Sequence, residues 1–122
     1  MLLMKILCET LSKPLNNLDK LEGLNLRSWQ VTDKIAESLS EGLNLKKELR
    51  SLDLGENRLG PEGIKILGDS LKTHVRLHQF FLDNNYLRGE ESAEGLWAAL
   101  KHKQDLRIFN IDNNNLGPDG MK

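Results

Sequence analysis

The stretch LRSLDLGENRL, residues 49–59, decides the fold. Leucines stand at its first, fourth, sixth and eleventh places, and an asparagine, Asn57, stands at the ninth. Apolar residues that alternate over a few positions are typical of a short strand with every second side chain in a core. The stretch therefore predicts a short buried strand, followed by a turn that carries the asparagine.

The same pattern, L-x-x-L-x-L-x-x-N-x-L, recurs along the chain in near-perfect register. The four units begin at Leu21, Leu49, Leu77 and Leu106. The steps between them are 28, 28 and 29 residues, and a fixed period of this length indicates a solenoid of stacked repeats. We predict a single domain over residues 1–122, with a partial unit at residues 1–20 and an incomplete last unit.

The second half of each unit predicts a helix. Gly60 is acceptable as N-cap, Pro61 suits the first helical position, and Glu62 favours the positive helix end. Apolar residues then follow at helical spacing, namely Ile64, Leu67 and Leu71. The N-terminal partial unit has the same spacing, and its helix should end near Ser12 because Pro14 follows.

Units of 28 and 29 residues with a strand and a full helix resemble the ribonuclease-inhibitor-like subfamily of leucine-rich-repeat proteins. The resemblance covers the chain from about Leu2 to Lys122. It implies an α/β fold, a right-handed leucine-rich-repeat solenoid with parallel strands on the concave face and helices on the convex face. It also implies a protein-binding role and a cytoplasmic (intracellular) location. Relatives include ribonuclease inhibitor, Ran GTPase-activating proteins, NOD-like receptors and tropomodulin-like actin cappers.

The repeated asparagines predict a structural ladder. A strand that turns outward leaves buried backbone groups unpaired, and an asparagine side chain can satisfy them because it has both a donor and an acceptor. The ladder residues are Asn57, Asn85 and Asn114. Trp29 takes this place in the first unit, so either that unit is distorted or Trp29 caps the N-terminal side of the solenoid.

The reactive residues lack the spacing of a catalytic or metal site. There is no His-x-x-x-His or Cys-x-x-Cys motif, and the single cysteine, Cys8, has no basic group placed to activate it. The acidic run from Asp112 has Leu116 where a calcium loop needs its fifth-position oxygen. We predict no enzyme active site, no metal and no cofactor. His74 and His102 are expected to be solvated near helix ends.

The balanced charge gives no reason to expect nucleic acid or a membrane as partner, since the formal net charge is -1. The apolar run at the N-terminus contains Lys5 and Glu9, which favours an amphipathic helix over a signal peptide. Charged helix residues are expected to face solvent. They include Lys34, Lys46, Lys47, Lys65, Lys72 and Lys101.

The concave strand face is the predicted binding surface, because residues between the core leucines point away from the core. They form three columns across the units. The first column is Gly23, Ser51, Gln79 and Ile108, the second is Asn25, Asp53, Phe81 and Asn110, and the third is Arg27, Gly55, Asp83 and Asp112.

An aromatic among polar and acidic groups is typical of a protein-binding hot spot. The predicted partner site consists of Phe81, Asp53, Asp83, Asp112, Asn110, Asn25 and Arg27. Its acidic excess, which Glu56 extends, favours a basic protein partner. Alternatively, Phe81 turns sideways and packs on Ile108.

Three functions remain open. The first is an interaction module or scaffold. The second is a GTPase-activating or other regulatory protein resembling the Ran-directed proteins, which work through polar residues at strand ends (here Asn57, Asp83, Asn84 or Asn113). The third is an inactive fragment of a longer repeat protein. Residues 117–122 repeat residues 60–65 position for position, so the chain stops in the first turn of a further helix. Uncapped ends predict self-association.

Overall fold

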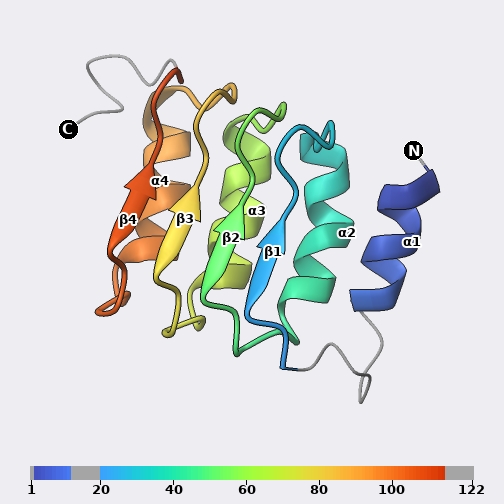
Figure 1. Ribbon diagram of the computed structural model, residues 1–122. Coiled ribbons are helices and arrows are strands. Elements are labelled where there is room, and N and C mark those ends of the chain that lie inside the picture. The colour runs from blue at the N-terminus through green and yellow to red at the C-terminus, as the bar shows by residue number, and fades with distance from the viewer. Residues whose placement is uncertain (1, 12–19, 115–122) are drawn as a thin grey trace.

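Strands and helices alternate in two layers. The computed structural model describes residues 2–11 and 20–114, so Leu116 and the Gly-Pro-Asp-Gly turn lie outside the described residues. The elements are α1 (Leu2–Leu11), β1 (Gly23–Asn25), α2 (Asp33–Leu43), β2 (Ser51–Asp53), α3 (Pro61–Leu71), β3 (Gln79–Phe81), α4 (Gly89–Leu100) and β4 (Ile108–Asn110). The strands lie side by side in front of the row of helices (Figure 1). The predicted α/β solenoid is confirmed.

The sheet keeps the register of the repeat. Its order is β1-β2-β3-β4 and every pair is parallel. Leu24 lies opposite Leu52, Leu52 opposite Phe80, and Phe80 opposite Phe109. Each step of the sequence repeat therefore places equivalent residues side by side, and the columns read from the sequence become rows of neighbours across the sheet.

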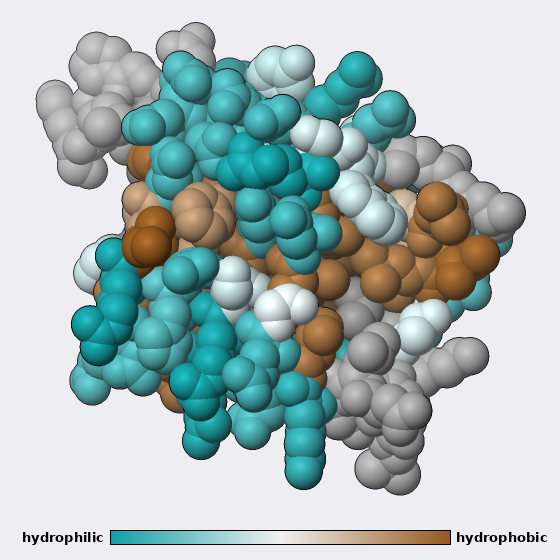
Figure 2. Space-filling view, in the orientation of Figure 1, coloured by the Kyte–Doolittle hydropathy of each residue, from teal (hydrophilic) through white to brown (hydrophobic). Residues whose placement is uncertain are grey.

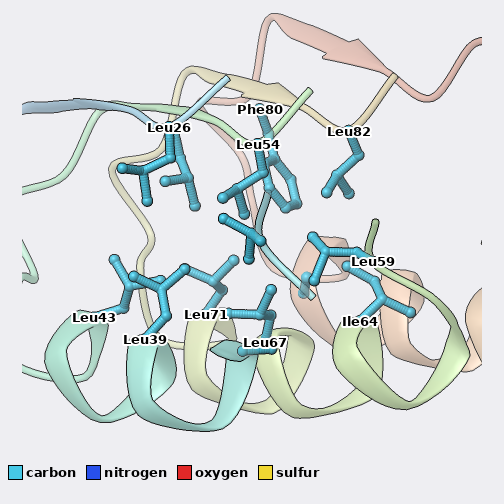
Figure 3. Packing of buried hydrophobic residues seen from close by; sticks show 14 of the residues in the cluster. Leu26, Leu39, Leu43, Leu54, Leu59, Ile64, Leu67, Leu71, Phe80 and Leu82 are labelled. Atoms are coloured by element: carbon cyan, nitrogen blue, oxygen red, sulfur yellow. The ribbon is translucent and has the colours of Figure 1, made fainter. Parts of the chain in front are cut away.

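The core fills the space between the two layers (Figure 3). Strand residues such as Leu52 and helix residues such as Leu67 have no exposed surface. Full burial of a leucine side chain contributes about 1.5–3 kcal/mol, so the leucines that define the repeat also supply most of the apolar burial. On the β4 side, Phe109 is only partly buried by the described residues, whereas its equivalent Phe80 is fully buried.

The close approach of α3 and α4 depends on two glycines. A Cβ atom added to Gly68 would lie 2.1 Å from the carbonyl oxygen of Gly95. A side chain at this place would push the helices apart, which explains a glycine inside a helix despite its unfavourable propensity. The glycines thus set the helix spacing in this part of the solenoid.

Two residues expected at the surface are buried, and the expectation was wrong for both. Lys46 and His74 have no exposed surface, and Lys103, at the same place in the next unit, is also buried. His74 Nε2 lies 2.7 Å from the carbonyl oxygen of Leu43, and Lys103 Nζ donates to that of Leu71 at 2.6 Å. These carbonyls end α2 and α3, where helical acceptors lack partners within the helix. His74 and Lys103 therefore cap the helix ends of the preceding units.

Burial lowers the pKa of both His74 and Lys103. It lowers the pKa of His74 to about 4, with the positive charges of Lys47 and Lys103 adding to the effect. It also lowers the pKa of Lys103 to about 8. His74 is therefore neutral at pH 7, and its Nε2–H donates to the Leu43 carbonyl, while Nδ1 has no hydrogen-bond partner among the described residues.

No helix within residues 2–11 and 20–114 is long and apolar enough to cross a membrane.

Candidate protein-interaction face

The strand face carries the residues of the predicted partner site, and no helix covers it (Figure 1). In the same orientation, Figure 2 shows hydrophilic residues gathered above and below a more apolar band. Phe81 lies directly between Asp53 and Asn110 in the register of the sheet. The structure thus brings the second column together as one row of neighbouring side chains.

Three residues of this row stabilise, through their side chains, the backbone turn that follows their own strand. The side-chain oxygens of Asn25, Asp53 and Asn110 each accept a hydrogen bond, at 2.9 Å, from the backbone N–H two residues later. This is the Asx-turn, which short polar side chains form at the end of a strand. Phe81 cannot make this bond. Its half-buried ring therefore takes no part in the turn that its neighbours stabilise.

Arg27 lies across the acidic residues of the face. Its Nε donates to Asp53 at 2.9 Å, and its two Nη atoms reach the carboxylate of Asp83 at 2.8 and 3.0 Å. Nη1 also donates to Glu56 at 3.1 Å. One guanidinium thus joins three successive units through a bidentate, charge-assisted arrangement, the strongest geometry that arginine and carboxylate form.

Gly55 makes room for this arginine. A Cβ atom at Gly55 would lie 2.4 Å from Nη2 of Arg27, so any side chain there would displace the guanidinium. The hydrogen bonds from Arg27 hold the pKa of the nearly buried Asp83 below its ordinary value, and the same bonds raise the pKa of Arg27. Both groups therefore stay charged across the physiological range.

The ion pairs with Arg27 reduce the number of carboxylates on the strand face that are available to a partner. Asp53 and Asp83 were predicted as partner contacts, but both carboxylates are engaged with Arg27. Asp112 is exposed and makes no ion pair with any described residue. The free part of the face therefore lies over β3 and β4, with Phe81, exposed Ile108 and Asp112 as its least engaged side chains.

The asparagines at the ends of the strands bond across the units. Oδ1 of Asn57 accepts from the N–H of Val31 at 2.8 Å, and its Nδ2 donates to the carbonyl of Leu26 at 3.0 Å. Asn85 and Asn114 repeat both bonds one and two units further on. The amide groups of these side chains are therefore engaged in hydrogen bonds with the backbone of this chain.

Trp29 lies in an altered turn, which favours the first of the two alternatives for this residue. The loop after β1 has two residues in the left-handed region, Ser28 at φ 63° and Gln30 at φ 59°. The second and third loops have one each at the place of Ser28, namely Glu56 and Asn84, and Asn113 takes the same conformation in the fourth unit. The first unit is therefore distorted where the asparagine is missing.

A polar groove of about 530 Å³, which sequence reasoning missed, runs beside these loops. It is lined by Ser28, Gln30, Glu56, Asn57, Arg58, Asn84 and Tyr86. The exposed ring of Tyr86 stands in it, at a variable position between the repeat asparagine and the next core leucine. The groove adjoins Glu56, so it extends the face beyond the strands.

Within the described ranges, no group of three or more histidine, cysteine, aspartate or glutamate side chains is placed to hold a metal ion. Cys8 is buried, and burial raises the pKa of its thiol. Neither the cysteine nor the carboxylate cluster offers an activated group for catalysis.

Known proteins share both the sequence pattern and the fold. The Leucine Rich repeat family model matches residues 48–68 and 102–122. The human NACHT, LRR and PYD domains-containing protein 13 is 34% identical over 118 residues, which is 97% of this chain and 11% of that protein. Protein 3 of the same series from Rattus norvegicus is 34% identical over 114 residues, covering 93% of this chain and 11% of that protein. The chain thus spans about a tenth of the length of these relatives.

Solved structures agree at the level of the fold. Leiomodin-1 Actin-Binding Site 2 superposes with a TM-score of 0.74 at 17% identity, covering 93% of this chain and 65% of that one. The Caenorhabditis elegans tropomodulin C-terminal domain gives 0.71 at 22% identity, covering 88% and 65%. Together with the repeat register and the parallel sheet, these matches identify the chain as a leucine-rich-repeat protein.

Proposed function

We propose that the chain is an interaction module that binds a protein partner on its concave strand face, over β3 and β4. The observation that carries the proposal is Phe81. It replaces the turn-stabilising Asn or Asp that the other units have, and it lies on an uncovered face. An aromatic side chain surrounded by polar groups is the usual centre of a binding hot spot.

The partner surface in this proposal is basic and contains an apolar group. Asp112 is free of ion pairs within the described structure, and Glu56 remains largely exposed despite its contact with Arg27. Such charges act mainly by steering association, so binding should become faster at low salt. Arg27, Asp53 and Asn25 contribute by holding the face in shape, and Asn110 holds the turn that presents Asp112.

Two further features support the proposal. Leucine-rich repeats are present in the curated relatives, and one structural neighbour is described as an actin-binding site, so this fold serves protein binding elsewhere. A scaffold role in the cytoplasm fits the same reading, because a single cysteine, Cys8, rules out an intrachain disulfide framework.

Photo-crosslinking in cells tests the proposal. A photoreactive phenylalanine analogue is placed at Phe81 and, as the control, at Trp97, which is 65% exposed on α4 in the helix layer behind the strands (Figure 1). We expect the analogue at position 81 to capture a defined protein, and Asp112→Lys to weaken that capture. Identical products from both positions, or no product from position 81, would contradict the proposal.

We also propose self-association through the β4 side. Leu106, Phe109 and Ile111 are only partly buried by the described residues, although their equivalents in the preceding unit are fully buried. Sedimentation velocity should show a weight-average mass that rises with concentration. A constant monomer mass over a hundred-fold range of concentration would reject this part.

A further inference from the structure

The loops that connect α2, α3 and α4 to the next strand form a separate edge of the solenoid, which is the lower edge in Figure 1. They comprise residues 44–50, 72–78 and 101–107. Their charged residues are mostly basic, with only Glu48 and Asp105 as acids. The exposed cations are Lys47, Arg50, Lys72, Arg76, Lys101 and Arg107. We call this set of loops the basic edge. The near-zero net charge of the chain conceals it, because the strand face is acidic.

The cations are not equally available. On the first two loops, Arg50 pairs with Glu22 at 3.5 Å and Arg76 with Glu48 at 3.6 Å. Exposed pairs of this kind contribute little and open readily. On the third loop, Lys101 and Arg107 make no ion pair with any residue in the described ranges. Lys72 pairs with Asp69 at 3.0 Å, and Lys47 donates to the hydroxyl of Thr73. Lys101 and Arg107, at the β4 end, are therefore the least engaged cations of the edge.

Exposed aliphatic side chains lie at the other end. Leu45 is 44% exposed on the first loop, and Val75 is 54% exposed on the second. A hydrogen bond from Lys47 to Thr73 joins these two loops. The edge thus has an order, with an apolar part followed by the part that holds its least engaged cations.

We propose that the basic edge binds an extended acidic segment of a partner protein. Aliphatic residues of that segment contact Leu45 and Val75, and the carboxylates that follow pair with Lys101 and Arg107. A chain that runs across the loops meets both parts in turn. This surface is distinct from the strand face, so the proposal does not depend on partner binding at Phe81.

Other polyanions fit the basic edge less well. The three loops contain no phenylalanine, tyrosine or tryptophan on which the bases of a single-stranded nucleic acid could stack. Binding to a lipid surface uses an amphipathic helix with an extended apolar face, whereas the exposed aliphatic side chains of the edge, Leu45 and Val75, lie on two separate loops. The order of the two parts favours a polypeptide.

Fluorescence anisotropy with the whole chain tests the proposal. The probe is a labelled synthetic peptide with two leucines followed by a run of glutamates, and the comparison peptide has the same composition in shuffled order. Lys101→Glu combined with Arg107→Glu should weaken binding of the probe by about ten-fold or more. The matched control, Lys34→Glu combined with Lys65→Glu, makes the same change in net charge at exposed helix positions and should change affinity by less than about two-fold.

A second pair of variants tests the apolar part. Leu45→Ser combined with Val75→Ser should weaken binding of the ordered peptide and leave a pure glutamate peptide unaffected. Equal effects of the two charge-reversal pairs, or equal binding of ordered and shuffled peptides, would overturn the proposal. Tighter binding of a single-stranded RNA, or of vesicles that contain phosphatidylserine, would also overturn it in favour of another anionic partner.

Discussion

Asn85→Ala tests how the strand ends are held together, because the bonds of this side chain can be followed one by one. Oδ1 accepts from the N–H of Leu59 at 2.9 Å. Nδ2 donates to three carbonyl oxygens, of Leu54 at 2.9 Å, Leu82 at 3.1 Å and Asp83 at 3.3 Å. The side chain is almost completely buried, so water does not readily replace these bonds.

When Asn85 is replaced by alanine, the three carbonyl oxygens keep other hydrogen bonds, whereas the N–H group of Leu59 does not. The Leu54 and Leu82 carbonyls keep bonds from the neighbouring ladder residues, Asn57 and Asn114. The carbonyl of Asp83 keeps its bond from a backbone N–H in the preceding unit. Only the buried N–H of Leu59 is left without a partner. An orphaned donor costs about 1–3 kcal/mol, and the weakened carbonyl bonds add about 1 kcal/mol, so we expect a loss of about 2–4 kcal/mol.

Urea denaturation followed by circular dichroism measures this loss. With an ordinary dependence on urea, the midpoint should fall by about 1–2 M. Gln79→Ala is the control, because Gln79 is an exposed amide on β3, the strand that precedes Asn85, and its effect should stay within about 0.5 kcal/mol. Asn85→Asp should be at least as harmful as Asn85→Ala at pH 7, since a carboxylate cannot donate to the carbonyls. Equal midpoints for Asn85→Ala and Gln79→Ala would refute the reasoning.

Three further predictions concern other parts of the molecule. Arg27→Ala should lower the free energy of unfolding by about 1.5–3 kcal/mol at pH 7, measured by urea denaturation, because its carboxylate partners lose charge-assisted hydrogen bonds; a change below about 0.5 kcal/mol would contradict it. Because the pKa of His74 is lowered to about 4 in the folded chain, the unfolded chain takes up a proton first as the pH falls below about 6.5. Stability should therefore drop by up to about 3 kcal/mol between pH 6.5 and 4, and His74→Gln should remove most of this slope; an unchanged slope would reject the assignment. Gly68→Ala should destabilise by about 1–3 kcal/mol through the clash with Gly95, whereas Gly23→Ala, which meets nothing within 4 Å, should be nearly neutral in the same thermal melts.

The fold could be predicted from the sequence because every unit repeats the same pattern. Leucines at fixed places dictate both the strand register and the apolar side of each helix, so a single period specifies the whole architecture. The concave columns followed from simple alternation along the strands. Local pattern and global fold agree in this chain, which is the condition under which sequence reasoning succeeds.

Long-range side-chain contacts could not be predicted in the same way. The flexible side chain of Arg27 reaches Asp83 across 56 residues of sequence, and no spacing rule indicates which carboxylates it will meet. The burial of Lys46 and His74 could have been predicted from the sequence. Lys46, His74 and Lys103 stand at one repeat position, three residues before a core leucine. A basic residue repeated at the end of successive helices indicates a helix cap, although its charge alone suggests solvent.

Isothermal titration of the protein captured through position 81 would test the central claim most directly. Phe81→Ala should weaken its binding by about thirty-fold or more, as expected for a hot-spot side chain, with an unchanged urea midpoint. Trp97→Ala on the helical side should change the affinity by less than about two-fold. Full affinity in Phe81→Ala, together with a loss in Trp97→Ala, would show that the partner binds the helices and would contradict the account.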